Sequence, residues 1–452
     1  RIKLMFLKKN KFNRYFFLLI ITLMTIFNKS NNNIFIQFNF IIISIFFLIF
    51  LKEKNYFSHI KSIFSKNKIA ISLFFFFIIF LIFQTIPIPI EWIKILSPGK
   101  YNFLNRLEFS GRFSSISLSP TNSYFSILNY LSLFLCLIIF KSLFYRKKDI
   151  FKFYFFLISL GAFASSVAVY FYLIDNPDFL IIKNSAYKAV ATGFFINRTV
   201  FSCFLTLCFF CGIEYLKMID YYQKGNPNNF FNKIYIRIFI LLITIGIITS
   251  FSRLGNFLFI SLIIIYILRS LYINEKKNSF FFITLILIVL FDVLILGFYF
   301  GSEKLLQRYS FLQSEINEYL PTSTQNNTSR GELLKFAFIQ FKNFTFFGYG
   351  GGGFENLFKI NFQNFSTRYA SHAHSDLIEF VGEFGLIGSV LIFLSIFYSF
   401  LNNNFFSFKN FILCYLLLFI LFFDFSFHVP IIQLVFILLL SINYKSDNNF
   451  NN

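Results

Sequence analysis

Long apolar runs alternate with short polar connections along almost the whole chain. A helix needs about 20 apolar residues to cross the hydrocarbon layer of a membrane, and this length divides the chain into about twelve predicted transmembrane helices. The pattern therefore predicts an all-α integral membrane protein. The predicted spans are residues 13–27, 34–51, 69–90, 124–144, 153–174, 197–216, 235–250, 254–272, 280–300, 376–400, 411–425 and 429–443.

The charges in the connections predict how the chain is oriented. Every second connection is short and rich in Lys and Arg, and short loops of this kind stay in the cytoplasm. These basic connections are residues 52–68, 145–152 and 269–278. The N-terminus is then inside, and residues 91–123, 175–196 and 301–375 are outside. The last of these is the largest and is expected to form a small domain of its own.

The spans and the outer segments divide the chain into five sequential parts. We predict N-terminal spans with the first outer segment, central spans that carry two arginine sites, a large outer loop, C-terminal spans and a cytoplasmic tail. In the same order, these parts are residues 1–123, 124–300, 301–375, 376–443 and 444–452.

Composition excludes a water-soluble protein. The chain has 452 residues, of which 57% are hydrophobic and only 13% are charged, so its apolar surface exceeds what a soluble core can hide. A formal net charge of +21 would suggest a nucleic-acid partner in a soluble protein. Here the basic residues lie in short connections between apolar runs, so we interpret the charge as membrane topology and expect membrane lipids, not nucleic acid, around the protein.

The cysteines and the N-terminus add two further expectations. All five cysteines fall inside apolar runs, and Cys208 with Cys211 has no second pair at metal-site spacing, so neither disulfides nor zinc are expected. The chain opens at Arg1 without a Met, and its first apolar run lacks a small-residue cleavage site. We expect no cleavable signal and interpret the start as clipped.

Arg198 and Arg253 are predicted at the outer ends of two spans. Arg198 lies in ATGFFINRTVFSCFL and Arg253 in GIITSFSRLGNFLF, a tight outer turn. An arginine at the edge of the hydrocarbon is either functional or a structural anchor that snorkels to water. Two at one face favour phosphate, because a guanidinium group grips phosphate oxygens with two parallel hydrogen bonds. A phosphate at the outer face suggests a lipid-linked pyrophosphate.

Two other polar stretches are interpreted mainly as turns. FGYGGGGF (347–354) could bring backbone N–H groups to an anion, but it lacks the Lys-Ser or Lys-Thr pair of a nucleotide-binding loop, and a turn that lets the outer loop re-enter the membrane surface is favoured. DNPD (175–178) does not have the spacing of metal-binding carboxylates. No metal is expected.

Three acids open the long apolar run that follows the outer loop. Asp376, Glu379 and Glu383 share one helical face at spacings of three and four. Ser375 or Asp376 can cap the helix, and Glu379 can complete a box-like arrangement at its start. Capping and a polar stripe therefore account for these acids.

His372 and His374 precede that helix and are not needed for its capping. A neutral imidazole near a carboxylate is a good proton acceptor at neutral pH, and one at the mouth of a membrane cavity could deprotonate a sugar hydroxyl. We interpret at least one of the two as a general base. A metal site and a solvated loop histidine are the alternatives.

Together these stretches resemble the O-antigen ligase and O-antigen polymerase superfamily of bacterial membrane glycosyltransferases. ATGFFINRTVF resembles its Gly-x-Phe-x-Asn-Arg segment, TSFSRLG its Ser-Arg turn, and SRGELLKFAFIQFKNFTFFGYGGGGF its large-loop helix and Gly-x-Gly stretch. HAHSDLIEFVGEFGLIG is similar to its His-Asn-Asp segment that ends in Glu-x-Gly-x-x-Gly, and FDFSFHVP is similar to its last periplasmic turn. The resemblance covers roughly residues 85–443 in the right order.

The resemblance implies a helical architecture like that of C-type glycosyltransferases, with a large periplasmic loop domain, in the bacterial inner membrane. It implies an undecaprenyl-pyrophosphate-linked saccharide as donor and no metal or cofactor. Arg198 and Arg253 match the family's pyrophosphate-binding arginines, and Arg330 matches the arginine that leads the loop helix. His374 matches the presumed base, and His372 matches its less essential neighbour.

These residues predict an inverting glycosyl transfer at the periplasmic face. The acceptor could be lipid A core, another lipid-linked glycan or a protein hydroxyl, which would make the protein an O-antigen ligase, a polymerase or a protein glycosyltransferase. A multi-span transporter or flippase of lipid-linked glycans is the alternative, and it would predict charges in mid-span, where Asp292 is the only clear acid. A non-catalytic scaffold is the third interpretation, and the Arg and His residues on one face argue against it.

Overall fold

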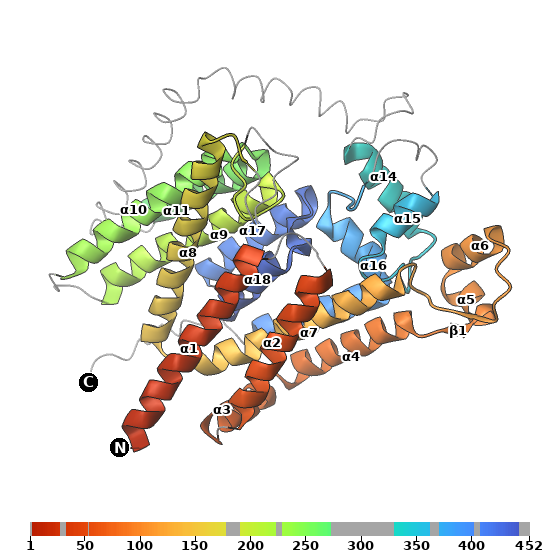
Figure 1. Cartoon of the computed structure of the whole chain (residues 1–452), viewed down its shortest axis with the longest axis horizontal. Coiled ribbons are helices and arrows are strands. Elements are labelled where there is room, and N and C mark those ends of the chain that lie inside the picture. The colour runs from red at the N-terminus through yellow and green to blue at the C-terminus, as the bar shows by residue number, and fades with distance from the viewer. Residues whose placement is uncertain are drawn as a thin grey trace. The chain divides into compact units, whose positions relative to one another are not determined.

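The computed structural model describes residues 2–27, 33–52, 54–177, 190–222, 228–272, 330–361, 370–401 and 407–442, which are mostly helical (Figure 1). Every predicted span except 280–300 coincides with a helix, and residues 280–300 lie outside the described ranges. The helices of these spans are α1 (Ile2–Phe27), α2 (Asn33–Leu51), α4 (Lys68–Thr85), α7 (Pro120–Leu143), α8 (Lys147–Leu173), α9 (Arg198–Tyr222), α10 (Asn228–Thr249), α11 (Arg253–Tyr272), α16 (Asp376–Leu401), α17 (Phe408–Phe423) and α18 (Pro430–Ser441).

Seven of the described helices are long and apolar enough to cross a membrane. They are α2, α4, α7, α8, α9, α11 and α16. Helices α17 and α18 are apolar but shorter. The chain is therefore a multi-pass helical membrane protein, while the count of twelve spans and their orientation stay predictions.

Short elements occupy the connections between the spans. They are α3 (Lys54–Lys66), β1 (Ile88–Pro89), α5 (Ile90–Leu96), α6 (Pro98–Arg106), β2 (Phe113–Ser114), α14 (Arg330–Phe341), α15 (Phe354–Asn361) and the 3-10 helix η2 (Ser426–His428). The all-α prediction missed β1 and β2, which pair antiparallel with Ile88 opposite Ser114. The predicted span 69–90 is too long, because Pro87 and Pro89 cannot continue a helix and α4 ends at Thr85.

The described helices form two compact units, and each is considered by itself. The first unit contains Arg1–Asn32, Arg146–Leu333 and Phe419–Ile432. The second unit contains Asn33–Tyr145, Leu334–Leu418 and Gln433–Asn452. The predicted division into five sequential parts describes membrane topology, which this grouping by contacts does not test.

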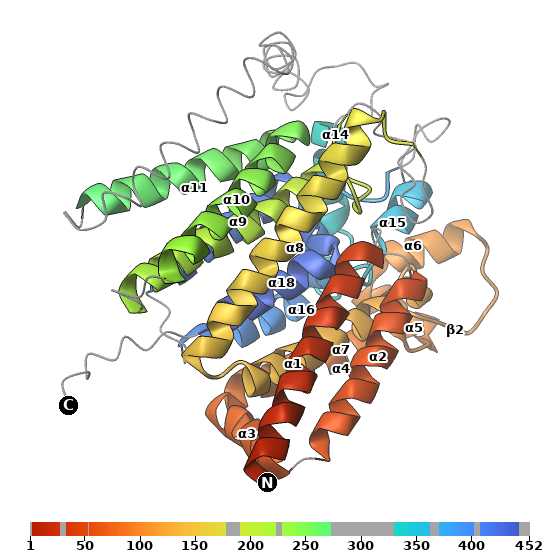
Figure 2. The same cartoon turned by 60° about the vertical axis from the view of Figure 1, so that its left-hand side comes forward.

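Helix α9 is the centre of the first unit. Within its most apolar stretch of 18 residues, 94% of the residues are buried. It packs against α8, α10 and α11, and Figure 2 shows α8, α9 and α10 side by side. Glycines let these helices approach closely, because a Cβ at Gly161 would lie 2.5 Å from Cys208 Cβ, and one at Gly246 would lie 2.2 Å from Ser165 Oγ. Small residues at helix contacts are typical of membrane bundles, where close packing drives association.

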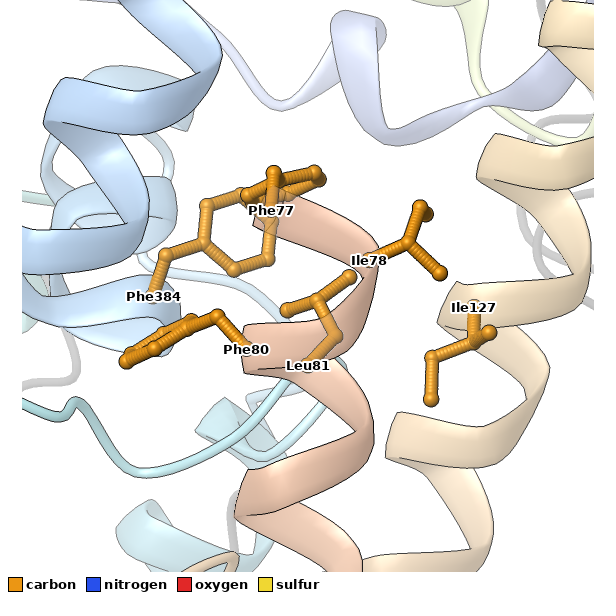
Figure 3. Packing of buried hydrophobic residues seen from close by; sticks show 6 residues of the cluster. All are labelled: Phe77, Ile78, Phe80, Leu81, Ile127 and Phe384. Atoms are coloured by element: carbon orange, nitrogen blue, oxygen red, sulfur yellow. The ribbon is translucent and has the colours of Figure 1, made fainter. Parts of the chain in front are cut away.

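Helix α4 is the centre of the second unit and packs between α7 and α16. Aromatic and branched side chains fill this contact, as Figure 3 shows for Phe77 and Phe80 of α4 against Phe384 of α16. The rings of Phe77 and Phe384 lie 5.2 Å apart at 90°, an edge-to-face arrangement that aromatic pairs prefer. This core fixes the part of α16 that carries the acids.

Candidate functional site

Arg198 and Arg253 each stand at the first position of a helix. Asn197 precedes α9, and its Oδ1 accepts the Thr199 N–H at 2.6 Å. Ser252 precedes α11, and its Oγ accepts the Gly255 N–H at 3.2 Å. Asn and Ser are favoured N-cap residues because they satisfy backbone N–H groups that the helix leaves open. The Asn-Arg and Ser-Arg pairs of the sequence are therefore caps followed by an arginine.

The two arginines lie at the same end of neighbouring helices. Helices α9 and α11 pack against each other, and a Cβ at Gly255 would lie only 2.0 Å from Ser202 Oγ. Ser202 is one turn beyond Arg198, and Gly255 is two residues beyond Arg253, so the contact lies near the start of both helices. Both arginine side chains are half-buried.

This arrangement favours an anion. A helix N-terminus carries partial positive charge, so a cation at the first position is electrostatically unfavourable there and an anion is favourable. Two arginines at two adjacent N-termini concentrate positive charge at one end of the first unit. Guanidinium groups bind phosphate oxygens with bidentate bonds, so these two helix starts are candidate phosphate contacts.

The turn between α17 and α18 belongs to the same end of this unit. Phe419 of α17 packs on Phe257 of α11 with ring centroids 5.1 Å apart, and η2 contacts α9. In this turn Asp424 is buried and accepts a hydrogen bond from Ser426 Oγ. The turn corresponds to FDFSFHVP, and the sequence alone gave its residues no role.

Arg330, the third predicted arginine, is the first residue of α14, and its side chain is exposed. The residues that precede it lie outside the described ranges. Its predicted role with the other two arginines stays a prediction.

His372 and His374 lie in the second unit, in a loop that ends at Ser375, the residue before α16. His372 Nδ1 lies 2.9 Å from Glu379 Oε1, and Glu379 Oε2 accepts the Ala373 N–H at 2.8 Å. Glu379 is only 1% exposed. Glu379 was predicted to complete a box-like arrangement at the helix start. Instead its side chain extends past the helix start and binds the preceding loop, which carries the histidines.

His374 has a left-handed backbone, with φ at 59°. This conformation costs a non-glycine residue about 1–3 kcal/mol, and such residues cluster at functional sites when their surroundings hold them in place. The surroundings therefore hold this part of the loop in one conformation, while the role of His374 stays a prediction.

The glycine run lies against a break in α16. Gly385 interrupts the helix with φ at 63° and ψ at −175°. The Tyr349 and Gly350 N–H groups donate to the carbonyl oxygens of Gly382 and Glu383, both at 3.0 Å. The Gly352 N–H donates to Glu383 Oε1 at 2.7 Å. These donors are used within the protein, which favours the interpretation of FGYGGGGF as a re-entrant turn over that of an anion site.

Tyr349 connects this run to the histidine region. Burial, together with the nearby Glu383 and Glu379, raises the pKa of the Tyr349 phenol well above its usual value. The hydroxyl therefore stays protonated and donates to the Glu379 carbonyl oxygen at 3.3 Å. Glu379 and Glu383, one turn apart on α16, bind the histidine loop and the glycine run respectively. In the sequence, the only indication that Glu379 and Glu383 act together was their spacing, which places them on one face of a helix.

The described helices define the class, a multi-pass membrane protein with candidate anion-binding and proton-accepting groups. Residues 238–393 match the family model described as O-antigen ligase, and this match confirms the predicted resemblance to the O-antigen ligase and polymerase superfamily. The matched segment contains Arg253, Arg330 and both histidines, whereas Arg198 precedes it. A comparison with curated proteins finds no match. The family supports a membrane glycosyltransferase-like role in polysaccharide biosynthesis.

Proposed function

We propose that the protein is an inverting glycosyltransferase of the bacterial inner membrane. It takes a saccharide from an undecaprenyl-pyrophosphate carrier at the periplasmic face and transfers it to an acceptor hydroxyl, as an O-antigen ligase or polymerase does. The observation that carries this proposal is the pair of capped helix starts, held together by Gly255 and Ser202, that presents Arg198 and Arg253 at one end of the first unit.

The proposed reaction breaks the bond between the anomeric carbon and the pyrophosphate oxygen. The acceptor oxygen attacks the anomeric carbon from the opposite side, which inverts its configuration, and undecaprenyl pyrophosphate departs. Arg198 and Arg253 stabilise the charge that develops on the leaving group, and Arg330 is a further pyrophosphate contact. No metal takes part in this scheme, because guanidinium groups supply the positive charge.

The proton of the acceptor hydroxyl passes to the histidine loop. His374 is the proposed base, and His372 lies two residues before it in the same loop. A general base raises the nucleophilicity of the attacking oxygen, since the proton leaves as the new glycosidic bond forms. The acceptor is lipid A core, a second lipid-linked glycan or a protein hydroxyl.

Deletion of the gene tests the proposal in cells. We expect one surface glycan to disappear and its lipid-linked precursor to accumulate on the periplasmic leaflet, measured by mass spectrometry of extracted lipids and by lectin access from outside. Precursor confined to the cytoplasmic leaflet would support a flippase instead. An unchanged surface glycan profile would remove the proposed role.

A further inference from the structure

Glu379 has an unusual position for an acid near the start of a helix. Its side chain is 1% exposed, and both of its carboxylate oxygens reach back across the cap to the preceding loop. A buried carboxylate costs several kcal/mol unless hydrogen bonds compensate it. Two bonds to adjacent residues, His372 and Ala373, supply that compensation.

The bonds also fix the chemical form of His372. Oε2 accepts the Ala373 N–H, and Oε1 faces His372 Nδ1 at 2.9 Å. An ionised carboxylate has acceptors only, so the imidazole must donate from Nδ1. In neutral His372 the proton then resides on Nδ1, and the ring is tethered to α16 through it.

The bonds of Glu379 to His372 and Ala373 also constrain His374, the next residue in the loop. His374 is bounded on one side by the Glu379 bonds to His372 and Ala373, and on the other by the start of α16 at Asp376. Its left-handed φ of 59° is the kind of strained conformation that persists only when the surroundings determine it. The Glu379 bonds hold the two residues directly before His374 and so constrain the loop at this point.

We propose that Glu379 and His372 are positioning residues, a carboxylate–imidazole tether that holds the loop so that His374 is presented as the proton acceptor. This inference rests on the proposed glycosyl transfer. It assigns His372 the role of hydrogen-bond donor to Glu379 and not that of base.

Two variants of His372 separate a tether from a base. In His372→Asn the side-chain amide places an N–H donor close to where Nδ1 lies, so the bond to Glu379 can form, but no group of comparable basicity remains. In His372→Ala the donor is lost. We expect transfer to fall about 10- to 10²-fold in the Ala variant, because a misplacement of about 1 Å can cost 10²-fold, and to stay near the wild-type rate in the Asn variant.

Glu379→Gln tests the other partner. An amide has one acceptor oxygen and one NH₂ donor, so it cannot accept both the Ala373 N–H and the His372 Nδ1–H. Either one bond is lost or His372 adopts the opposite tautomer. Glu383→Gln is the matched control, since Glu383 is also buried on α16 but accepts the Gly352 N–H.

The experiment combines transfer rates with nitrogen-15 NMR of histidine-labelled protein, which contains only four histidines. We expect an Nδ1–H signal for His372 in the wild type and in Glu383→Gln, and slower transfer at unchanged donor binding in Glu379→Gln. Absence of the Nδ1–H signal in the wild type, or equal inactivity of His372→Asn and His372→Ala, would overturn the inference. If the wild type itself transfers no glycan, the proposed function fails, while the NMR signals still test the tether.

Discussion

Gly255 of α11 packs directly on Ser202 of α9, so closely that a Cβ at position 255 would lie 2.0 Å from Ser202 Oγ and 2.3 Å from its Cβ. The contact lies near the start of each helix, next to Arg253 of α11 and one turn beyond Arg198 of α9. The distance between the two guanidinium groups therefore depends on a glycine that bears no charge and makes no proposed contact with the donor.

Gly255→Ala is expected to separate the two helix starts and weaken donor binding and transfer. Overpacking of this kind costs about 1–3 kcal/mol. Ser202→Gly removes the atoms that the new methyl group would meet, so the double variant Gly255→Ala with Ser202→Gly should recover most of the loss. Donor binding and transfer rates of the single and double variants provide the test. A double variant as impaired as Gly255→Ala would contradict the close-contact argument.

Arg198→Ala and Arg253→Ala should each abolish detectable transfer. Lys at either position should restore it only partly, because an ammonium group cannot form the bidentate bonds of a guanidinium. Arg106→Ala is the control, since Arg106 is an exposed arginine of α6. Binding of a labelled lipid pyrophosphate measures the effect without the transfer step. Full activity of Arg253→Ala would leave the pyrophosphate role without support.

Much of the fold follows from the sequence, because apolar runs of membrane length leave few alternatives to a helix. The N-cap residues Asn197 and Ser252 also have a local signal, since each lies within three residues of the start of an apolar run. The end of α4 was misjudged for a physical reason. Ile86, Ile88 and Ile90 extend the hydropathy pattern of the run, but the prolines between them end the helix.

Other features depend on contacts between distant residues and have no local signal. Gly385 lies in an apolar run that the sequence predicts as one continuous helix. The helix is interrupted at Gly385 where the glycine run packs against it, and this contact has no signal in the run itself. The Gln84 side chain joins these parts, as its Nε2 donates to the Glu383 carbonyl oxygen at 3.0 Å and to that of Phe347. The reach of Glu379 back to His372 and Ala373 was hidden in the same way, because capping alone explained an acid at this position.

Gly348→Ala and Gly385→Ala should destabilise the protein strongly. A Cβ at Gly348 would lie 2.2 Å from the Glu383 carbonyl oxygen, and one at Gly385 would lie 2.3 Å from that of Phe346. Both residues have positive φ, which adds backbone strain. We expect a loss of at least about 2 kcal/mol in each, measured by thermal unfolding in detergent. Gly331→Ala, within α14, is the control and should unfold at or above the wild-type temperature. Wild-type stability of Gly348→Ala would contradict the packing of the glycine run against α16.

The orientation can be tested with single cysteines at exposed positions. Ser110 lies in the outer segment 91–123, and Lys148 lies in the basic connection 145–152. With a membrane-impermeant thiol reagent and a permeabilised outer membrane, Ser110→Cys should be labelled and Lys148→Cys should not. The unmodified protein gives the background, and four of its five cysteines are buried. The reverse labelling pattern would invert the topology.

The central claim is that the protein transfers a glycan from a lipid pyrophosphate, and reconstitution measures this most directly. Purified protein in liposomes, supplied with an undecaprenyl-pyrophosphate-linked saccharide and a matching acceptor, should release undecaprenyl pyrophosphate and glycosylated acceptor in equal amounts. His374→Ala should lower that rate about 10²- to 10⁴-fold, the usual contribution of a general base, while donor binding persists. Wild-type protein that moves the intact donor across the bilayer and forms no glycosylated acceptor would contradict the account.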